Sequence, residues 1–288
     1  MKKTLAMMTA AVMVAGALSG CGSSSSTPAA TTAAATEAAT TEAAGDTAAA
    51  AEGTVKTPSG KFTVGFDQEF PPMGFVGDDG QFTGFDLELA KEVASRLGLE
   101  FVPQPINWDA KDMELDSGNI DCIWNGFTMQ GREDDYTWVG PYMANNQVFV
   151  VTADSDIASK ADLAGKAVEV QKDSSGLAAL QGEAELSASF GSMTEVADYN
   201  TALMDLESGA CDAVCMDSIV AGYQIKSSGK DMKILDDTLS AEEYGIGFKK
   251  GEDELAKAVH DTLMDMKDDG TVAKISNDWF GSDVFTLK

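Results

Sequence analysis

The sequence predicts an α/β protein built of two similar lobes, each a mainly parallel sheet flanked by helices. From Phe62 onward, short apolar strands alternate with amphipathic helices, which is the pattern of parallel sheets. The segment Leu115–Trp124 is also similar to Leu206–Cys215. Both run from a helix end through a glycine and an acidic turn into an apolar strand. About 230 residues follow Val55, which suits two lobes of roughly a hundred residues each.

The first half of this region is expected to fold as β-α-β-α-β. Phe85–Leu97 predicts a helix because its apolar residues recur on one face, and Gly98 is a suitable C-terminal stop. The other expected elements are strands at Phe62–Phe66, Leu99–Pro103, Ile120–Trp124 and Val148–Val151, and a short helix at Asp109–Asp116.

A second α/β series follows. We expect strands at Ala167–Val170, Ser192–Val196 and Ala213–Met216, and helices at Gly176–Gly182 and Asn200–Ser208. Leu255–Met266 predicts a last amphipathic helix, with acidic residues at its start and Gly270 after it.

The N-terminus predicts export. Lys2 and Lys3 precede an uncharged apolar run, Leu5–Leu18, which has the length of a signal-peptide core and is short for a permanent span. The run ends in Leu18-Ser-Gly-Cys21, which resembles the lipobox of bacterial lipoproteins. This resemblance implies a signal peptide over 1–20 and a lipidated Cys21 that anchors the mature chain to the outer side of the cell membrane. The alternative is a plain secretory signal with an incidental cysteine.

Residues 21–54 are expected to form a disordered stalk behind the anchor. Ser, Thr, Ala and Gly dominate this stretch and it contains no aromatic residue, so it cannot bury enough apolar surface to offset backbone ordering. Such a tether would hold a globular domain close to a membrane partner.

Charge and cysteine content exclude several classes of protein. Without Lys2 and Lys3 the 20 basic residues become 18 against 47 acidic ones, a net charge of −29, which makes nucleic acid and anionic lipid headgroups poor partners. Cys122, Cys211 and Cys215 form an odd set after Cys21, so complete intramolecular pairing is excluded. With one histidine and no CxxC pair, no metal site and no cofactor are predicted.

Polar side chains follow the strand ends, where ligands bind in open α/β sheets. A zwitterionic amino acid needs a guanidinium for its carboxylate, a carboxylate for its ammonium, hydroxyl donors and aromatic walls. The predicted strand ends supply this set: Arg132, Asp217, Thr128, Ser175, Phe70 and Trp108. Instead of binding a ligand, Arg132 could form a surface ion pair with one of the acidic residues at 133–135.

From Phe62 to the C-terminus the chain resembles the polar amino-acid family of solute-binding proteins of ATP-binding-cassette importers. The matching stretches, in order, are Val64–Asp67 with Phe70–Pro72, Gly84–Ala90, Leu115–Gly118, Gly126–Met129 with Arg132, Pro141-Tyr142, Asp162–Lys166, Tyr244–Phe248, Asp269-Gly270 and Trp279–Gly281. The resemblance implies a type II periplasmic-binding-protein fold. Lobe 1 would comprise 55–147 and 241–288 and lobe 2 would comprise 148–240, joined by crossings near 144–152 and 235–243.

The resemblance also implies roles for individual residues. Arg132 would grip the ligand α-carboxylate and Asp217 the α-ammonium. The remaining contacts would come from Asp67, facing the ammonium or side chain, from Phe70 and Trp108 on either side of the side chain, and from Asn125, Gly126, Thr128, Gln171 and Ser175. Two departures stand out: the Met129–Arg132 turn is one residue shorter than usual, and Asp173 replaces a usual glycine.

The expected function is capture of a polar or charged amino acid by hinge closure and its delivery to the permease subunits of an importer, by a monomer without catalytic activity. Two alternatives are a dehydratase for cyclic acids, with Asp67 or Glu69 as general acid or base, and a sensory receptor ectodomain. No nucleophile–base–orienter set favours catalysis. Ligand identity stays open among basic, amide and neutral polar amino acids and cystine.

Overall fold

A computed structural model describes residues 57 and 59–288 of the chain, which belong to one compact unit, Glu52–Lys288. The predicted signal peptide, Cys21 and the stalk lie outside the described residues. Within the part that the structure describes, no helix combines the length and apolarity needed to cross a membrane.

One sheet of nine strands runs through the described region in the order β5-β1-β6-β12-β7-β10-β8-β9, with β11 also paired to β7. At one end β5, β1 and β6 are parallel, and at the other end β10, β8 and β9 are parallel. The strands are β1 Lys61–Phe66, β5 Glu100–Pro105, β6 Cys122–Thr128, β7 Thr137–Thr152, β8 Ala167–Gln171, β9 Ser192–Val196, β10 Ala213–Asp217, β11 Met232–Ile234 and β12 Ser240–Phe248.

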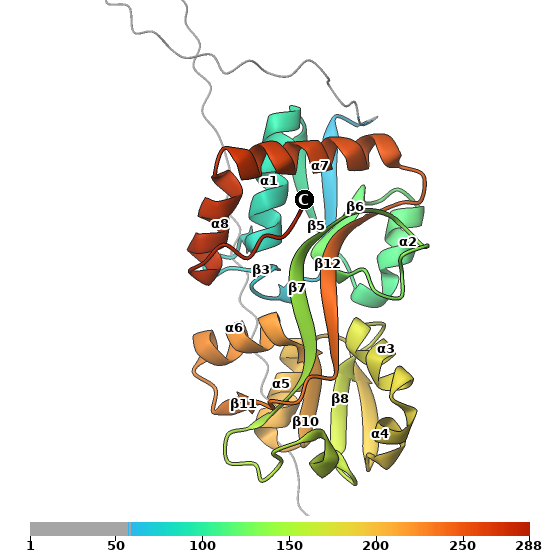
Figure 1. The fold of residues 1–288 in the computed structure, drawn as a ribbon, viewed down its shortest axis with the longest axis vertical. Helices are drawn as coiled ribbons and strands as arrows, with labels where there is room; N and C mark the ends of the chain where they lie inside the picture. Colours follow the sequence, from blue (N-terminus) through green and yellow to red (C-terminus); the bar gives the residue numbers. More distant parts are fainter. Residues whose placement is uncertain (1–56, 58) are drawn as a thin grey trace, which may run out of the picture. The chain divides into compact units, whose positions relative to one another are not determined.

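Two antiparallel strands pass between the two parallel parts, as the type II fold requires (Figure 1). β7 pairs with β12 from Gln147↔Ser240 to Thr137↔Phe248. We call the part with β1, β5 and β6 the first lobe and the part with β8–β11 the second lobe. The residue boundaries predicted for the lobes, 55–147 with 241–288 and 148–240, stay predictions.

The helices cover both lobes. The first lobe holds α1 Phe85–Leu97, α2 Lys111–Asp116, α7 Asp253–Asp268 and α8 Thr271–Phe280, with the 3-10 turn η1 Trp108–Ala110 before α2. The second lobe holds α3 Ser175–Gly182, α4 Ala184–Ser189, α5 Tyr199–Ser208 and α6 Ser218–Ser228, with the 3-10 turn η2 Lys160–Leu163. Because α7 and α8 pack on α1, the C-terminal segment returns to the first lobe (Figure 1).

The predicted boundaries of α1 are confirmed, including its end at Gly98, which adopts φ 70° in the left-handed region where glycine is favoured. The prediction for β7 was too short, since the strand begins at Thr137 rather than Val148. The polar residues Asn145 and Gln147 interrupt the apolar pattern that predicts a buried strand. Both are nevertheless buried, because they form hydrogen bonds to other buried polar groups. No strand was predicted for β12, nor for the small sheet β2 Glu69–Phe70, β3 Gly74–Val76 and β4 Phe82–Thr83.

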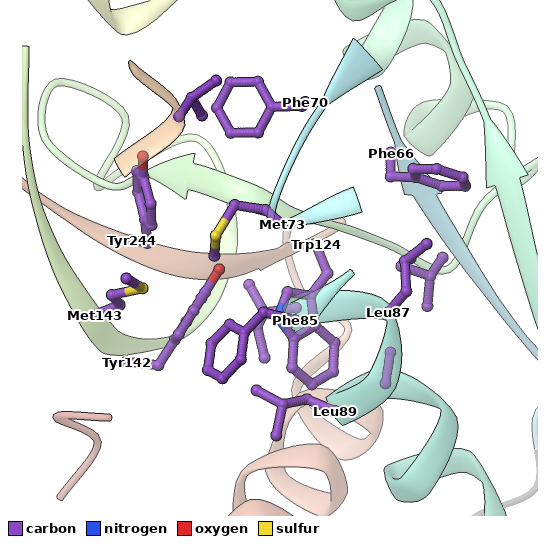
Figure 2. Close-up of a cluster of buried hydrophobic side chains, with 14 of the residues drawn as sticks. Phe66, Phe70, Met73, Phe85, Leu87, Leu89, Trp124, Tyr142, Met143 and Tyr244 are labelled. Atoms are coloured by element: carbon purple, nitrogen blue, oxygen red, sulfur yellow. The ribbon is translucent and has the colours of Figure 1, made fainter. Parts of the chain in front are cut away.

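Apolar side chains fill both faces of the sheet. In the main cluster, Trp124 is fully buried and packs edge-on against Tyr142, with Phe85 and Leu89 of α1 beneath (Figure 2). Trp124 is therefore a core residue, as its position in an apolar strand suggested. Phe149 and Val170 belong to a second cluster in the second lobe.

The three described cysteines are buried free thiols. Burial raises the pKa of Cys122 and Cys215 well above the usual value and that of Cys211 to about 12. They are therefore protonated, unreactive parts of the packing. Among the described residues no group of three or more His, Cys, Asp or Glu side chains could hold a metal ion.

Candidate functional site

The strand ends of the two lobes meet where β7 and β12 pass between them. In the first lobe Asp67 follows β1 and Thr128 ends β6, and in the second lobe Gln171 ends β8 and Asp217 ends β10. Because the strands at each end of the sheet are parallel, the polar side chains at their carboxyl ends lie close together.

A small cavity lies between these strand ends. Its lining is Phe70, Trp108, Gly126, Thr128, Arg132, Gln171, Ser174, Ser175 and Asp217, which includes every predicted site residue except Asp67 and Asn125. The cavity measures only about 10 Å³, close to the space of one water molecule. An amino acid can therefore enter only if the lobes separate.

Two larger cavities adjoin the small one. A cavity of about 840 Å³ shares Trp108 with it and is also lined by Asp67, Glu69 and Asp198. A cavity of about 310 Å³ on another side shares Thr128, Arg132 and Ser175. The small cavity thus lies between an acidic space and a more apolar one.

Arg132 is held without a carboxylate partner among the described residues. Its backbone N–H donates to the Met129 carbonyl at 3.0 Å, which closes the short turn, and its Nη1 donates to the Thr128 carbonyl at 3.2 Å. The guanidinium also lies 5.1 Å from the centre of the Phe127 ring. Of the acids at 133–135, none forms an ion pair with it. A partly buried guanidinium of this kind is a ready partner for a carboxylate.

Asp217 is a buried carboxylate held by neutral donors. The hydroxyls of Tyr244 and Tyr199 donate to it at 2.6 and 2.8 Å, and Asn145 Nδ2 donates at 2.7 Å. Only 3% of Asp217 is exposed, and no cation lies within ion-pair distance among the described residues. The donors fix the carboxylate at the cavity wall, where a ligand ammonium would supply the missing positive charge.

Asp67 lies across the lobe boundary from Gln171. Gln171 Nε2 donates to the Asp67 carboxylate at 2.7 Å, and the Glu69 N–H donates to it at 2.9 Å. Burial raises the pKa of Asp67 from its ordinary 3.8 to about 6, because the hydrogen bonds offset the loss of solvation only in part.

Backbone geometry at Gly126 requires a glycine. Its φ is +58°, and an added Cβ would lie 2.9 Å from the Phe70 ring and 3.1 Å from the Tyr244 ring. The Gly126 N–H donates to the buried Asp86 carboxylate at 2.7 Å, which also accepts from Tyr142. Gly126 thus lets the aromatic rings approach the backbone at the cavity wall.

The remaining predicted residues are placed as follows. Phe70 packs against Tyr199 with ring centres 5.7 Å apart, and Trp108 packs edge-on against Phe127 at 5.6 Å. Thr128 Oγ1 donates across the lobe boundary to Ser175 Oγ at 3.2 Å. Asn125 does not line the small cavity, since its Oδ1 accepts from the Asp67 N–H at 3.0 Å.

Several residues at the boundary between the lobes were not predicted from the sequence. Lys111 of α2 donates to the Asp173 carboxylate, Lys172 to Asp109 at 2.6 Å, and Asn200 to Glu69, so three further contacts join the lobes. Asp173 has φ +55°, which lies in the left-handed region that favours glycine. Asn145, Gln147 and Glu242 lie behind the cavity on the two strands that cross between the lobes. Their only sequence signal is polarity within otherwise apolar strands.

The comparisons with known proteins agree with this architecture. Residues 62–282 match the model of the bacterial extracellular solute-binding proteins, family 3. The chain is 32% identical to the L-cystine-binding protein TcyJ of Escherichia coli over 231 residues, covering 78% of this chain and 84% of TcyJ. It is also 32% identical to the L-cystine-binding protein TcyA of Bacillus subtilis, covering 78% of this chain and 83% of TcyA.

A solved structure is similar over the whole described fold. The substrate-binding protein of an ABC uptake transporter from Streptococcus pneumoniae, determined with bound histidine, has a TM-score of 0.77 and 34% identity, covering 80% of this chain and 96% of that one. Fold, site and family match together define a solute-binding protein of the two-lobed type, from a family whose members are extracellular. The chain belongs to the bacterial extracellular solute-binding proteins, family 3.

Proposed function

We propose that this protein binds an amino acid between its lobes and delivers it to the permease of an ATP-binding-cassette importer. One observation carries the proposal: the Arg132 guanidinium and the Asp217 carboxylate line the same cavity, one from each lobe. A zwitterion bound there would pair its carboxylate with Arg132 and its ammonium with Asp217. The relatives named as cystine-binding proteins support this ligand class.

Closure of the lobes is the proposed mechanism. A ligand that contacts both lobes stabilises the closed arrangement by its higher affinity for that state. Thr128 and Ser175 would add donors at the carboxylate, with backbone contacts from Asn125 and Gly126, while Phe70 and Trp108 would enclose the side chain. The closed form would then dock on the permease.

The acidic cavity of about 840 Å³ would take the ligand side chain. Carboxylates at its wall, including Asp67, Glu69 and Asp198, favour a side chain with a cationic or hydrogen-bond-donating end, and Gln171 would contribute from the second lobe. Lys172 lines the same cavity, so an amino acid with charges of both signs at its distal end also fits.

We infer the cellular setting from the N-terminal sequence. Removal of residues 1–20 would leave Cys21 as the lipidated first residue, and residues 22–54 would tether a monomeric binding domain to the outer face of the cell membrane. Labelling with a radioactive fatty acid tests this, since Cys21→Ser should abolish incorporation and release the protein into the medium.

We propose no catalytic role. The competing dehydratase hypothesis would use Asp67 or Glu69 as acid or base, yet Asp67 is bonded to Gln171 and Glu69 to Asn200. The hypothesis of a sensory ectodomain gains no support from the relatives, which are named as binding proteins.

Isothermal titration of the folded region against the twenty amino acids and L-cystine tests the proposal. At least one should bind with a dissociation constant at or below about 1 µM, and the bound protein should unfold at higher temperature. Absence of binding by every one of these ligands would contradict the proposal, and turnover of a cyclic acid would favour the enzyme.

A further inference from the structure

Glu242 is a buried carboxyl group on one of the two strands that cross between the lobes. Only 5% of the residue is exposed, and it lies on β12 directly opposite Asn145 of β7. Its Oε1 accepts from Asn145 Nδ2 at 2.6 Å and from Gln147 Nε2 at 2.9 Å. No cation lies within ion-pair distance of Glu242 among the described residues. A carboxyl group buried this way needs a structural or chemical reason.

The two amides that Glu242 holds also reach the proposed ligand site. Asn145 Nδ2 donates to Asp217 Oδ1 at 2.7 Å, and Gln147 Nε2 donates to Ser175 Oγ at 3.1 Å. Asp217 is the proposed partner of the ligand ammonium, and Ser175 a proposed donor near its carboxylate. One side chain on the crossing strand therefore orients groups that serve both ends of the zwitterion.

Asn145 Nδ2 donates to both Glu242 Oε1, at 2.6 Å, and Asp217 Oδ1, at 2.7 Å, so the two buried acids lie side by side around one amide. Two adjacent buried carboxylates repel, and the repulsion is relieved when one of them holds a proton. Asp217 accepts hydrogen bonds from three neutral donors, Tyr199, Tyr244 and Asn145. The proton therefore belongs on Glu242, which accepts two.

We propose that Glu242 is a positioning residue for the amino-acid site and that ligand binding releases the proton it carries. This inference rests on the proposed function. The ligand ammonium arriving at Asp217 places a positive charge beside Glu242, which stabilises the Glu242 carboxylate and sends its proton to the buffer.

The surroundings of Glu242 support this assignment. Burial, followed by the negative charge of Asp217, raises the pKa of Glu242 from its ordinary 4.5 to about 7. Tyr244 on the same strand, Tyr199 of α5 and Cys215 of β10 face the pair, and burial raises the pKa of each of them well above the usual value. They stay neutral around pH 7. Arg132, which lines the cavity of about 310 Å³ together with Glu242, is the charged group on the remaining side.

The sign of the pH effect follows from proton linkage. Because the ligand favours the deprotonated form of Glu242, affinity must rise as pH rises through the pKa of this group. Glu242→Gln imitates the protonated form, keeps an acceptor oxygen for Asn145 and Gln147, and cannot titrate. Glu243→Gln is a matched control, since Glu243 is the exposed neighbour on the same strand and its carboxylate accepts a hydrogen bond from Gln130 at 3.4 Å.

The first experiment needs no ligand. The stability of the wild-type protein linked to Glu242 is present below pH 4.5 and is lost as pH rises through about 7, because the folded state holds the proton longer than the unfolded chain. Glu242→Gln should therefore unfold at a higher temperature than wild type by about 5 °C at pH 7.5, and at nearly the same temperature at pH 4.5. Parallel pH dependence in wild type, Glu242→Gln and Glu243→Gln would overturn the inference.

The second experiment measures proton release. Titration with L-arginine and L-cystine in buffers of different ionisation enthalpy should show release of a proton by wild type near pH 6.5, and affinity about tenfold higher at pH 7.5 than at pH 5.5. Glu242→Gln should show neither effect while binding within about twofold of wild type at pH 5.5, and Glu242→Ala should bind about tenfold more weakly at every pH.

Equal proton release in wild type and Glu242→Gln would overturn the inference while leaving the proposed function intact. If neither ligand, nor any amino acid in the earlier screen, binds to wild type, the proposed function fails. The unfolding comparison then still decides whether Glu242 holds a proton.

Discussion

Lys111, whose side chain is 2% exposed, reaches from α2 of the first lobe to the Asp173 carboxylate in the turn between β8 and α3 of the second lobe. Its ammonium also donates to the Asp173 carbonyl at 3.4 Å. The carboxylate is 52% exposed, so the buried member of this pair is the cation. The pair forms only when the lobes are together, and it therefore contributes to the closed state.

The asymmetry of this ion pair predicts unequal effects of removing its two members. Asp173→Asn keeps a residue type that tolerates the left-handed backbone but leaves a buried ammonium without a counter-charge, so ligand affinity should fall about tenfold. Lys111→Met leaves an exposed carboxylate and should cost only about threefold. Titration calorimetry measures both, and the double variant should bind better than Asp173→Asn alone.

The ion pair between Lys172 and Asp109 is a matched control for the pair between Lys111 and Asp173. Lys172 and Asp109 also join the lobes, but their side chains are 56% and 39% exposed. For a ligand without a distal carboxylate, such as L-arginine, Lys172→Met should change affinity by less than about threefold, since exposed pairs are screened by solvent. A loss at Lys172 as large as that at Asp173 would contradict the argument from burial.

Gly126 should tolerate no side chain. Gly126→Ala places a Cβ against Phe70 and Tyr244 and forces φ +58° on a residue that disfavours it, so the free energy of unfolding should fall by about 2–4 kcal/mol. Gly118→Ala is the control, because Gly118 has φ +75° but nothing within 4 Å of an added Cβ, and it should lose only about 1 kcal/mol. Urea unfolding of both variants checks the difference, and equal losses would show that packing at Gly126 is not the cause.

Asp67 should make the unliganded protein less stable as pH rises. Its pKa is raised from 3.8 to about 6, so its contribution is fully present below pH 3.8 and is lost as pH rises through about 6. The loss amounts to roughly 3 kcal/mol at most. Asp67→Asn should make the pH slope shallower in urea unfolding measured between pH 4 and 7, because the Asp67 contribution is lost. An unchanged slope in Asp67→Asn would assign it to Asp86 or Glu242, whose pKa values are also raised, to about 7.

The sequence pattern predicted the helices and strands whose signals lie within their own residues. The helix at Phe85–Leu97 shows its apolar face and its glycine stop locally, and the strands at Ala167–Gln171 and Ser192–Val196 are short and bounded by turns. The crossing strands were harder because Asn145, Gln147 and Glu242 are buried polar residues that satisfy one another only when β7 and β12 are paired. That pairing joins residues about a hundred positions apart, which no local pattern reports.

The site residues also divide into those with a local sequence signal and those that depend on distant parts of the chain. Side chains just after apolar strands could be predicted to gather, because parallel strands end at one edge of a sheet. The structure brings most of them around one cavity, although their contacts with a ligand stay predictions. Lys111 could not be found in this way, since it lies on a helix and is buried by a partner in the other lobe.

The most direct test of the central claim pairs a change in the protein with a change in the ligand. The methyl ester of the best-bound amino acid lacks the negative charge that Arg132 is proposed to bind. In wild type the ester should bind at least about a hundredfold more weakly than the free amino acid, whereas in Arg132→Ala the two should bind equally weakly. If Arg132→Ala still prefers the free amino acid by the wild-type factor, Arg132 does not bind the carboxylate and the account is wrong.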